Sequence, residues 1–282
     1  MTPLLVSACT LATCLGKGLT ATLAGLYEGR SGLAPCAFET VVLDTWIGEV
    51  AGVDAQRLPP ALSLYDCRNN RLAQIGLESD AFADKVRAAA ERYGRQRIGV
   101  FLGTSTAGIL QTELAYRRRD PDSGALPADF VYRGTHNAFS LADFCREYFA
   151  LQGPAMTLST ACSSGAKAFA AAARHIACGT IDAALVGGVD SLCLTTLYGF
   201  ASLELTSQLP CRPYDVARNG LSIAEGAAFA LLERVPNEPE RGSVLLLGYG
   251  ESSDAYHMSA PHPQGLGARL AMAAALRSAA LT

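Results

Sequence analysis

The sequence MTLSTACSSGAKAFAAAARHIACG, residues 156–179, decides the fold of the region around it. Its first three residues give an apolar strand signal. The residues after Gly165 give an alanine-rich helix signal, which Gly179 is well placed to end. Only a few small or polar residues separate the two signals. The stretch therefore predicts a strand, a tight turn and a helix, which is the unit from which α/β folds are built.

One cysteine, Cys162, lies in the turn of this unit among small neighbours. The N-terminal end of a helix offers unpaired N–H groups and a positive partial charge, which favour a thiolate and a developing oxyanion. A sharp turn from strand to helix also lifts the side chain clear of the sheet. This setting favours a nucleophile, and the alternative interpretation is a core cysteine at the end of a strand.

Apolar strand signals alternate with helical signals along most of the chain. We expect strands at residues 4–8, 98–103, 155–158, 183–187, 227–233 and 244–249, and helices at residues 18–28, 79–93, 140–151, 164–178, 195–203 and 265–280. This alternation predicts an α/β fold with a largely parallel central sheet and helices on both faces. Residues 30–75 are expected to be rich in loops, and residues 117–135 to form a long excursion.

The composition argues against several classes of protein. Half of the 282 residues are hydrophobic, 17% are charged and the formal net charge is −3, so no nucleic-acid-binding surface is expected. No apolar stretch reaches the length of a membrane span, and the run before Cys9 is too short for a secretory signal. The nine cysteines include no CxxC pair, so most are expected to be reduced in a cytoplasmic protein.

Several motifs resemble, in the same order along the chain, those of the β-ketoacyl synthases, the condensing enzymes of fatty acid and polyketide synthesis. The most telling is TACSSG at residues 160–165, which resembles the active-site signature of that family. The other similar stretches are EGRSG at 28–32, AALVGGVD at 183–190, CRPYD at 211–215, EGA at 225–227, LLE at 231–233 and SSDAYHMSAPHPQG at 252–265. The chain departs from the family at Ala224, where the family has the first glycine of GEGA.

The resemblance implies a thiolase-like layered α-β-α-β-α fold with a mixed, mostly parallel sheet. Residues 1–235 would form the N-terminal thiolase-like domain, and residues 236–282 the start of a truncated C-terminal one. Cys162 would take an acyl group from an acyl carrier protein, and malonyl-acyl carrier protein would then condense with it, losing carbon dioxide, to give a β-ketoacyl thioester. No organic cofactor or metal is implied. Because the family forms two-fold dimers, a homodimer or a heterodimer with a related synthase is expected.

The family completes its site with motifs that this sequence lacks, namely HGTGT-like and GHxxGA-like histidine motifs, a lysine and a GFGG loop. None of the four histidines, His136, His175, His257 and His262, stands in such a motif. The chain is therefore expected to be the N-terminal portion of a condensing enzyme.

Three alternatives remain open. They are a non-catalytic fragment, a partner or chain-length subunit of a condensing heterodimer, and an initiating synthase or thiolase that uses coenzyme A esters. Cys162 disfavours the second alternative, and the CRPYD stretch disfavours the third. The stretch YDCRNNR at residues 65–71 is similar to condensing enzymes of aryl polyene pigment pathways.

Two further residues are expected by resemblance to line the acyl pocket. Thr106 follows the strand at 98–103, and Phe200 lies in the helix at 195–203. The alternatives are a turn of small residues for Thr106 and a core position for Phe200. Metal binding by the loop that contains His257 and His262 is not expected, because no further ligand stands near the two histidines.

Overall fold

The chain is built around one mixed β-sheet with the strand order β10-β1-β9-β7-β5-β6, in which β2 also pairs with β1. The computed structural model describes residues 1–238, 240–257 and 260–281. The strands of this sheet are β1 (Leu4–Thr13), β2 (Gly16–Lys17), β5 (Ile98–Gly103), β6 (Ala155–Leu158), β7 (Ala183–Asp190), β9 (Gly226–Arg234) and β10 (Val244–Leu246). A smaller sheet consists of β3 (Ala34–Pro35), β4 (Trp46–Gly48) and β8 (Ile223–Ala224).

Four strands of the large sheet point in the same direction. β5 pairs in parallel with both β6 and β7, whereas β9 runs antiparallel to β7 and to β1. β1 therefore points the same way as β5, β6 and β7, and β9 and β10 are reversed. The expected mixed sheet is confirmed, but only the two pairings of β5 are parallel, and the other four described pairings of this sheet are antiparallel.

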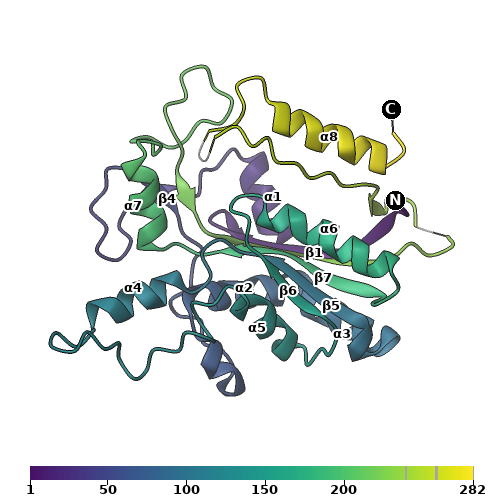
Figure 1. Cartoon of the computed structure of the whole chain (residues 1–282), viewed down its shortest axis with the longest axis horizontal. Coiled ribbons are helices and arrows are strands. Elements are labelled where there is room, and N and C mark those ends of the chain that lie inside the picture. Colours follow the sequence, from purple (N-terminus) through teal and green to yellow (C-terminus); the bar gives the residue numbers. More distant parts are fainter. Residues whose placement is uncertain (239, 258–259, 282) are drawn as a thin grey trace.

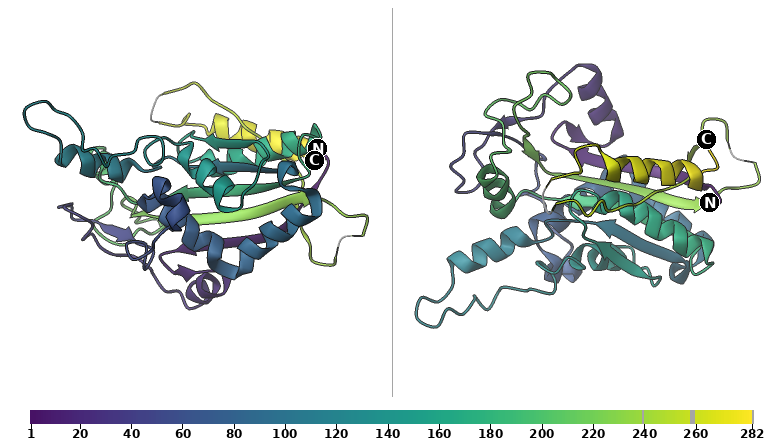
Figure 2. Two further views of the ribbon diagram at one scale, coloured as in Figure 1. Left: turned by 90° about the horizontal axis from the view of Figure 1, so that it is seen from below. Right: turned by 45° about the horizontal axis from the view of Figure 1, so that its top comes forward.

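Helices cover both faces of the sheet, so that the chain forms three layers (Figures 1 and 2). The α-helices are α1 (Leu19–Tyr27), α2 (Arg68–Glu78), α3 (Phe82–Tyr93), α4 (Ile109–Arg117), α5 (Ser140–Tyr148), α6 (Ser164–Ala177), α7 (Leu194–Ser202) and α8 (Leu266–Ser278). The 3-10 helices are η1 (Pro60–Tyr65), η2 (Ser79–Ala81) and η3 (Arg95–Arg97). In Figure 1, α6 lies on one face of the sheet and α2, α3 and α5 lie on the other.

The side chains of β7 show how the two faces are filled. Leu185 and Val189 belong to the core beneath α2, α3 and α5, whereas Ala184 and Val186 belong to the core beneath α6. This alternation is the two-residue period of a strand that is covered on both sides. It makes β7 a central strand, with its end held between the two helical layers.

Two helices were missing from the prediction. The expectation that residues 30–75 are mainly loops is wrong from residue 68 onward, where α2 begins. The first turn of α2 is polar yet buried at Arg68, Asn69 and Asn70, so it lacks the apolar periodicity that marks a helix. α4 was also missed, but the long excursion is confirmed, since no helix or strand lies in the described chain between α4 and α5.

The end of the chain lies beside α6. β10 joins the edge of the large sheet by pairing with β1, and the groove between α6 and α8 is lined by residues of both helices. The division into domains at residue 235 stays a prediction. Among the residues whose structure is described, no helix combines the length and the apolar character that crossing a membrane requires.

Candidate active site

Cys162 lies in the predicted turn between a strand and a helix. β6 ends at Leu158, α6 begins at Ser164, and Cys162 is exposed between them. The residue before it, Ala161, has φ = 53°, in the left-handed region that residues with a Cβ rarely adopt. The sharp turn predicted from the sequence is therefore present, and it presents the thiol to solvent at the N-terminal end of α6.

Hydroxyl groups close this turn. The Ser164 hydroxyl accepts a hydrogen bond from the Thr160 N–H at 2.8 Å and donates to the Ala161 carbonyl oxygen at 2.5 Å. The Ser163 hydroxyl donates to the Thr160 carbonyl oxygen at 2.9 Å. The buried Ser164 hydroxyl thus adds to the hydrogen bonds of the turn backbone, whereas the exposed Ser163 hydroxyl contacts only Thr160.

Glycines allow α6 to approach the sheet directly below the cysteine. A Cβ on Gly103, the last residue of β5, would lie 2.4 Å from the Gly165 nitrogen and 2.4 Å from the Ser164 carbonyl carbon. A Cβ added to Gly188, on β7, would lie 3.4 Å from the Gly165 Cα. The backbone of the first helical turn therefore packs on the backbone of two strands, which fixes the height of the elbow above the sheet.

The carboxyl ends of β5, β6 and β7 meet at this point. The Thr104 N–H donates to the Leu158 carbonyl oxygen at 3.1 Å, which ties the loop after β5 to the strand that leads to Cys162. Asp190, at the end of β7, accepts hydrogen bonds through Oδ1 from the Ser105 and Thr106 N–H groups at 2.6 and 2.9 Å. Ligands of open α/β sheets bind outside such strand ends.

Thr106 and Phe200, the two residues expected to line an acyl pocket, differ in burial and in hydrogen bonding. Thr106 is buried, and its hydroxyl donates to Asp190 Oδ1 at 3.0 Å and accepts from the Ser191 N–H at 3.1 Å. This hydroxyl is therefore committed to the loop. Phe200 is partly exposed on α7, whose first turn donates two N–H groups to Glu113 on α4. A role for either residue in an acyl pocket stays a prediction.

The structure contains a buried ion pair between Arg68 and Glu225 that the sequence analysis did not predict. Arg68 donates to both carboxylate oxygens of Glu225 at 2.8 Å, and Glu225 also accepts the Val50 and Leu192 N–H groups. Glu225 opens the EGA stretch at residues 225–227, and these contacts give it a structural role. Arg68 gave no signal, because its partner lies 157 positions away in the sequence.

The cysteines differ in exposure: Cys67, Cys145 and Cys193 are buried, and Cys14, Cys36 and Cys211 are partly exposed. Burial raises the pKa of the Cys67 thiol to about 12, and it also raises the pKa values of Cys14, Cys145 and Cys193. Thiols of this kind are poor nucleophiles at neutral pH. The exposed cysteines are Cys9, Cys162 and Cys178. Of these, only Cys162 stands at the N-terminal end of a helix.

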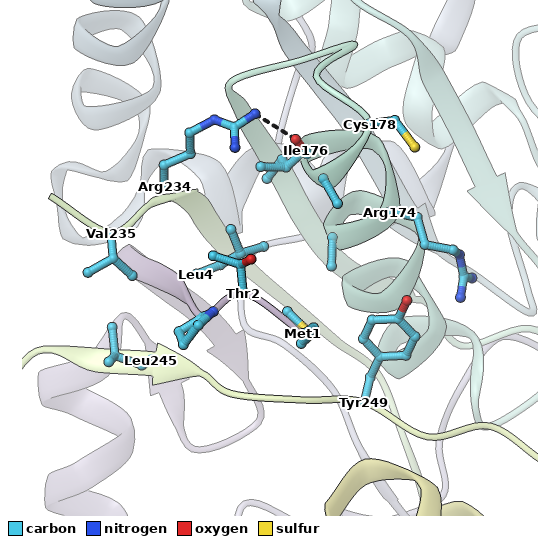
Figure 3. A pocket seen from close by; sticks show the side chains of 13 residues that line it. Met1, Thr2, Leu4, Arg174, Ile176, Cys178, Arg234, Val235, Leu245 and Tyr249 are labelled. Atoms are coloured by element: carbon cyan, nitrogen blue, oxygen red, sulfur yellow. Dashed lines mark hydrogen bonds between the residues drawn. The ribbon is translucent and has the colours of Figure 1, made fainter. Parts of the chain in front are cut away.

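Three hollows in the described part of the chain are lined by residues of α6. An apolar cavity of about 700 Å³ lies at its C-terminal end and is lined by Leu4, Ile176, Leu245 and Tyr249 among others (Figure 3). Its first lining residue on α6, Ala173, comes nine positions after Ser164, so the cavity begins about 14 Å along the helix from the elbow. A groove of about 570 Å³ begins at Ser163 and runs between α6 and the segment before α8. A third hollow, of about 540 Å³, also lies near the N-terminal end of α6 and is lined by Gly165 and Phe169 together with residues of β1, β7 and β9.

Two residues of a charged cluster, Lys167 and Glu251, line this groove. Lys167 and Arg174, both on α6, contact Glu251 at 2.6 and 3.0 Å. The hydrogen bond from Lys167 is the main cause that lowers the pKa of Glu251, and Arg174 adds to it. The cluster fixes the chain after β10 on α6, next to the elbow.

Within the described residues, no group of three or more histidine, cysteine, aspartate or glutamate side chains is arranged to hold a metal ion. The Asp254 carboxylate instead accepts the backbone N–H groups of His262 and Tyr256 at 3.0 and 3.2 Å. Asp254 thus bonds backbone groups of the segment that contains His262.

Comparisons with known proteins agree with this geometry. The family described as "Beta-ketoacyl synthase, N-terminal domain" matches residues 70–237, which is more than half of the chain and includes the elbow. A 3-oxoacyl-[acyl-carrier-protein] synthase 2 of Vibrio cholerae is 29% identical, over 95% of this chain and 67% of its own length. Nodulation protein E of Rhizobium meliloti is also 29% identical, over 89% of this chain and 63% of its own length.

Solved structures are similar over the whole chain. A ketosynthase (ApeO), in complex with its chain length factor (ApeC) from Xenorhabdus doucetiae, has a TM-score of 0.85 and 35% identity, covering 100% of this chain and 69% of that one. A β-ketoacyl synthase from Burkholderia phymatum has a TM-score of 0.82 and 27% identity, with coverage of 100% and 71%. The chain thus spans about two thirds or less of the curated relatives and about 70% of the solved ones.

Proposed function

The chain belongs to the β-ketoacyl synthase family, and we propose that its Cys162 accepts an acyl group from the thioester of an acyl carrier protein. The observation that carries this proposal is the position of the thiol. Cys162 is exposed in a strained turn, at the N-terminal end of α6 and beside the carboxyl ends of three parallel strands. The names of the relatives support the class of substrate.

In the first step, the Cys162 sulfur attacks the carbonyl carbon of the acyl thioester. The bond from that carbon to the carrier sulfur breaks, and the carrier leaves as a thiol after taking up a proton. While the tetrahedral intermediate exists, its oxygen carries a negative charge. The Cys162 N–H at the end of α6 is a suitable donor to that oxygen. This step uses groups that this chain contains.

In the second step, a malonyl thioester loses carbon dioxide and its enolate carbon attacks the acyl carbon on Cys162. The bond to the Cys162 sulfur then breaks, and the product is a β-ketoacyl thioester. The resemblance assigns the promotion of this step to histidine motifs that the 282 residues do not contain. The described histidines have other contacts. His136 pairs with Thr112, and His175 pairs with Thr180.

We also propose that the protein pairs with a second subunit of the same fold. Support comes from the 35% identical ketosynthase, which was solved in complex with its chain length factor. The opposite assignment, in which this chain is the non-catalytic partner, is disfavoured because Cys162 is present and exposed. Size-exclusion chromatography with light scattering, with and without a co-expressed chain length factor, would separate a heterodimer from a homodimer.

The test of acylation is intact mass after incubation with octanoyl-acyl carrier protein. We expect one octanoyl adduct on the native chain and none on Cys162→Ala. Cys178→Ala is the matched control, because Cys178 is an exposed cysteine at the other end of the same helix, and this variant should be acylated like the native chain. A folded native chain that gains no adduct, or an adduct that persists in Cys162→Ala, would refute the proposal.

A further inference from the structure

We propose that Ser164 is a positioning residue for Cys162, whose buried hydroxyl holds the elbow in the shape that aims both the thiol and its N–H at the substrate. This inference rests on the proposed function, because it concerns the attack of Cys162 on a thioester. It assigns to Ser164 a role in the rate of that step rather than in the stability of the fold alone.

The first observation is the strain in the turn. Ala161 has φ = 53° although it carries a Cβ, and no glycine stands at that position. Residues in the left-handed region persist only where the surrounding structure holds them, and they are frequent at functional sites. Something next to Ala161 must therefore keep the turn from relaxing to an ordinary extended conformation.

The second observation is the contact made by Ser164. Its hydroxyl joins the peptide group before Thr160 to the peptide group after Ala161, accepting from the Thr160 N–H at 2.8 Å and donating to the Ala161 carbonyl oxygen at 2.5 Å. The Ser164 N–H also donates to that carbonyl oxygen, at 3.1 Å. Ser164 is 3% exposed, so water cannot readily replace its hydroxyl.

The consequence for Cys162 follows from its place in the chain. The carbonyl group of Ala161 belongs to the same peptide as the Cys162 N–H, so the hydroxyl that holds this carbonyl also orients that N–H. The direction of the Cys162 side chain depends on the same backbone. Release of the Ser164 bridge would therefore turn the nucleophile and the oxyanion donor away from the substrate together, and small misplacements of reacting groups slow a reaction strongly.

Ser163 offers a matched control within the same turn. Its hydroxyl bonds the Thr160 carbonyl oxygen at 2.9 Å and lies 2.9 Å from the Thr160 hydroxyl. However, Ser163 is exposed, so water can take over these hydrogen bonds when the hydroxyl is removed. It also makes no bond to the Ala161 carbonyl. Removal of the Ser163 hydroxyl should leave the peptide before Cys162 in place.

The experiment compares Ser164→Ala with Ser163→Ala in the full chain, using octanoyl-N-acetylcysteamine as the acyl donor and mass spectrometry of the Cys162 peptide. In Ser164→Ala we expect the maximal acylation rate to fall by at least about ten-fold, with the half-saturating thioester concentration changed by less than about two-fold. In Ser163→Ala both quantities should stay within about two-fold of the native chain. A purely structural role would lower the unfolding midpoint of Ser164→Ala and leave the acylation rate of the folded protein unchanged, which would overturn the proposal.

Alkylation of Cys162 by iodoacetamide separates this proposal from the proposed function. Iodoacetamide needs no carrier protein and no acyl transfer, but its reaction still depends on the thiolate at the helix end. If the native chain is not acylated at all, the proposed function fails, and the role of Ser164 is decided by alkylation alone. A rate at least about three-fold lower in Ser164→Ala than in Ser163→Ala supports it, and equal rates overturn it.

A conservative variant covers the case in which Ser164→Ala does not fold. Ser164→Thr retains a hydroxyl at the same atom, so it should retain acylation or alkylation of Cys162 within about three-fold of the native rate. A folded Ser164→Thr chain that reacts more than about ten-fold slower than the native chain would overturn the proposal.

Discussion

Replacement of Arg68 by methionine should destabilise the chain more than any change to a surface charge. The Arg68 side chain is 4% exposed and that of Glu225 is 0% exposed, and the two groups share two hydrogen bonds of 2.8 Å. Burial works against the charged guanidinium, but the hydrogen bonds to Glu225 and the nearby Asp54 raise the pKa of Arg68 above its ordinary value. Without Arg68, the Glu225 carboxylate keeps only the Val50 and Leu192 N–H groups as partners.

The expected loss is that of a buried charge left without its partner, about 3 to 5 kcal/mol in the free energy of unfolding. For a chain of this size, 1 kcal/mol lowers the unfolding midpoint by about 2 to 4 °C, so the midpoint should fall by about 6 to 20 °C. The Glu225 carboxylate also holds the Leu192 N–H, two residues after the end of β7, so a carboxylate that shifts after losing Arg68 moves this strand end with it. The acylation rate of the folded variant should therefore fall as well.

Urea denaturation, followed by circular dichroism, measures the loss. The control is Arg118→Met, which breaks an ion pair with Asp129 whose side chains are 57% and 65% exposed, and it should cost less than about 1 kcal/mol. Glu225→Gln, combined with Arg68→Met, completes a double-mutant cycle, and we expect a coupling energy of about 2 kcal/mol. If Arg68→Met costs no more than Arg118→Met, the buried pair does not stabilise the fold as argued here.

Three further changes have definite expected outcomes. Gly103→Ala would put a Cβ 2.4 Å from the Gly165 nitrogen, so we expect a loss of about 1 to 3 kcal/mol and no acylation of the nucleophile, measured by denaturation and intact mass. Ala161→Gly should change the free energy of unfolding by less than about 1 kcal/mol, because glycine adopts φ = 53° without strain but gains freedom in the unfolded chain; a larger loss in urea denaturation would contradict this. The hydrogen bond from Arg97 lowers the pKa of Asp182 in the folded chain. The ionised Asp182 carboxylate therefore stabilises the fold fully at a pH above its ordinary pKa of 3.8, and this stabilisation is lost as the pH falls through the lowered pKa. Asp182→Asn should therefore cost about 0.5 to 1 kcal/mol at neutral pH, and the difference from the native chain should shrink in acid.

The elbow was predictable from sequence because its signals are local. The apolar strand, the small residues and the alanine-rich helix lie within 24 consecutive positions, and each restricts the backbone through its own side chain. α2 was not predictable in this way. Its first turn buries Arg68, Asn69 and Asn70, which read as a solvated segment unless their partners are known. Those partners, Glu225, Ser191 and Ser140, come from elsewhere in the chain.

The same distinction applies to the site. The type and position of Cys162 already suggested a nucleophile. In contrast, nothing near Asp190 in the sequence indicated that its carboxylate would accept hydrogen bonds from the loop after β5. Its hydrogen-bond donors lie 84 to 86 positions earlier, and they meet it only because β5 and β7 are neighbours in the sheet. The assignment of Thr106 to a pocket came from resemblance alone. Its hydroxyl contacts with Asp190 and Ser191 could be found only from the fold.

α6 carries an exposed cysteine at each end, and the contrast between them identifies what makes Cys162 special. Cys178 is the C-terminal cap of the helix, its N–H already donates to the Arg174 carbonyl oxygen at 2.9 Å, and Gly179 follows in the left-handed conformation. That end of a helix carries a negative partial charge, which disfavours a developing oxyanion. Cys162 is also exposed, but it lies at the N-terminal end of α6, where the partial charge of the helix is positive. Because residue 103 is a glycine, the first turn of α6 can pack directly on the end of β5. Exposure alone therefore does not single out a nucleophile, and we expect the direction of α6 across the sheet to decide which of the two cysteines reacts.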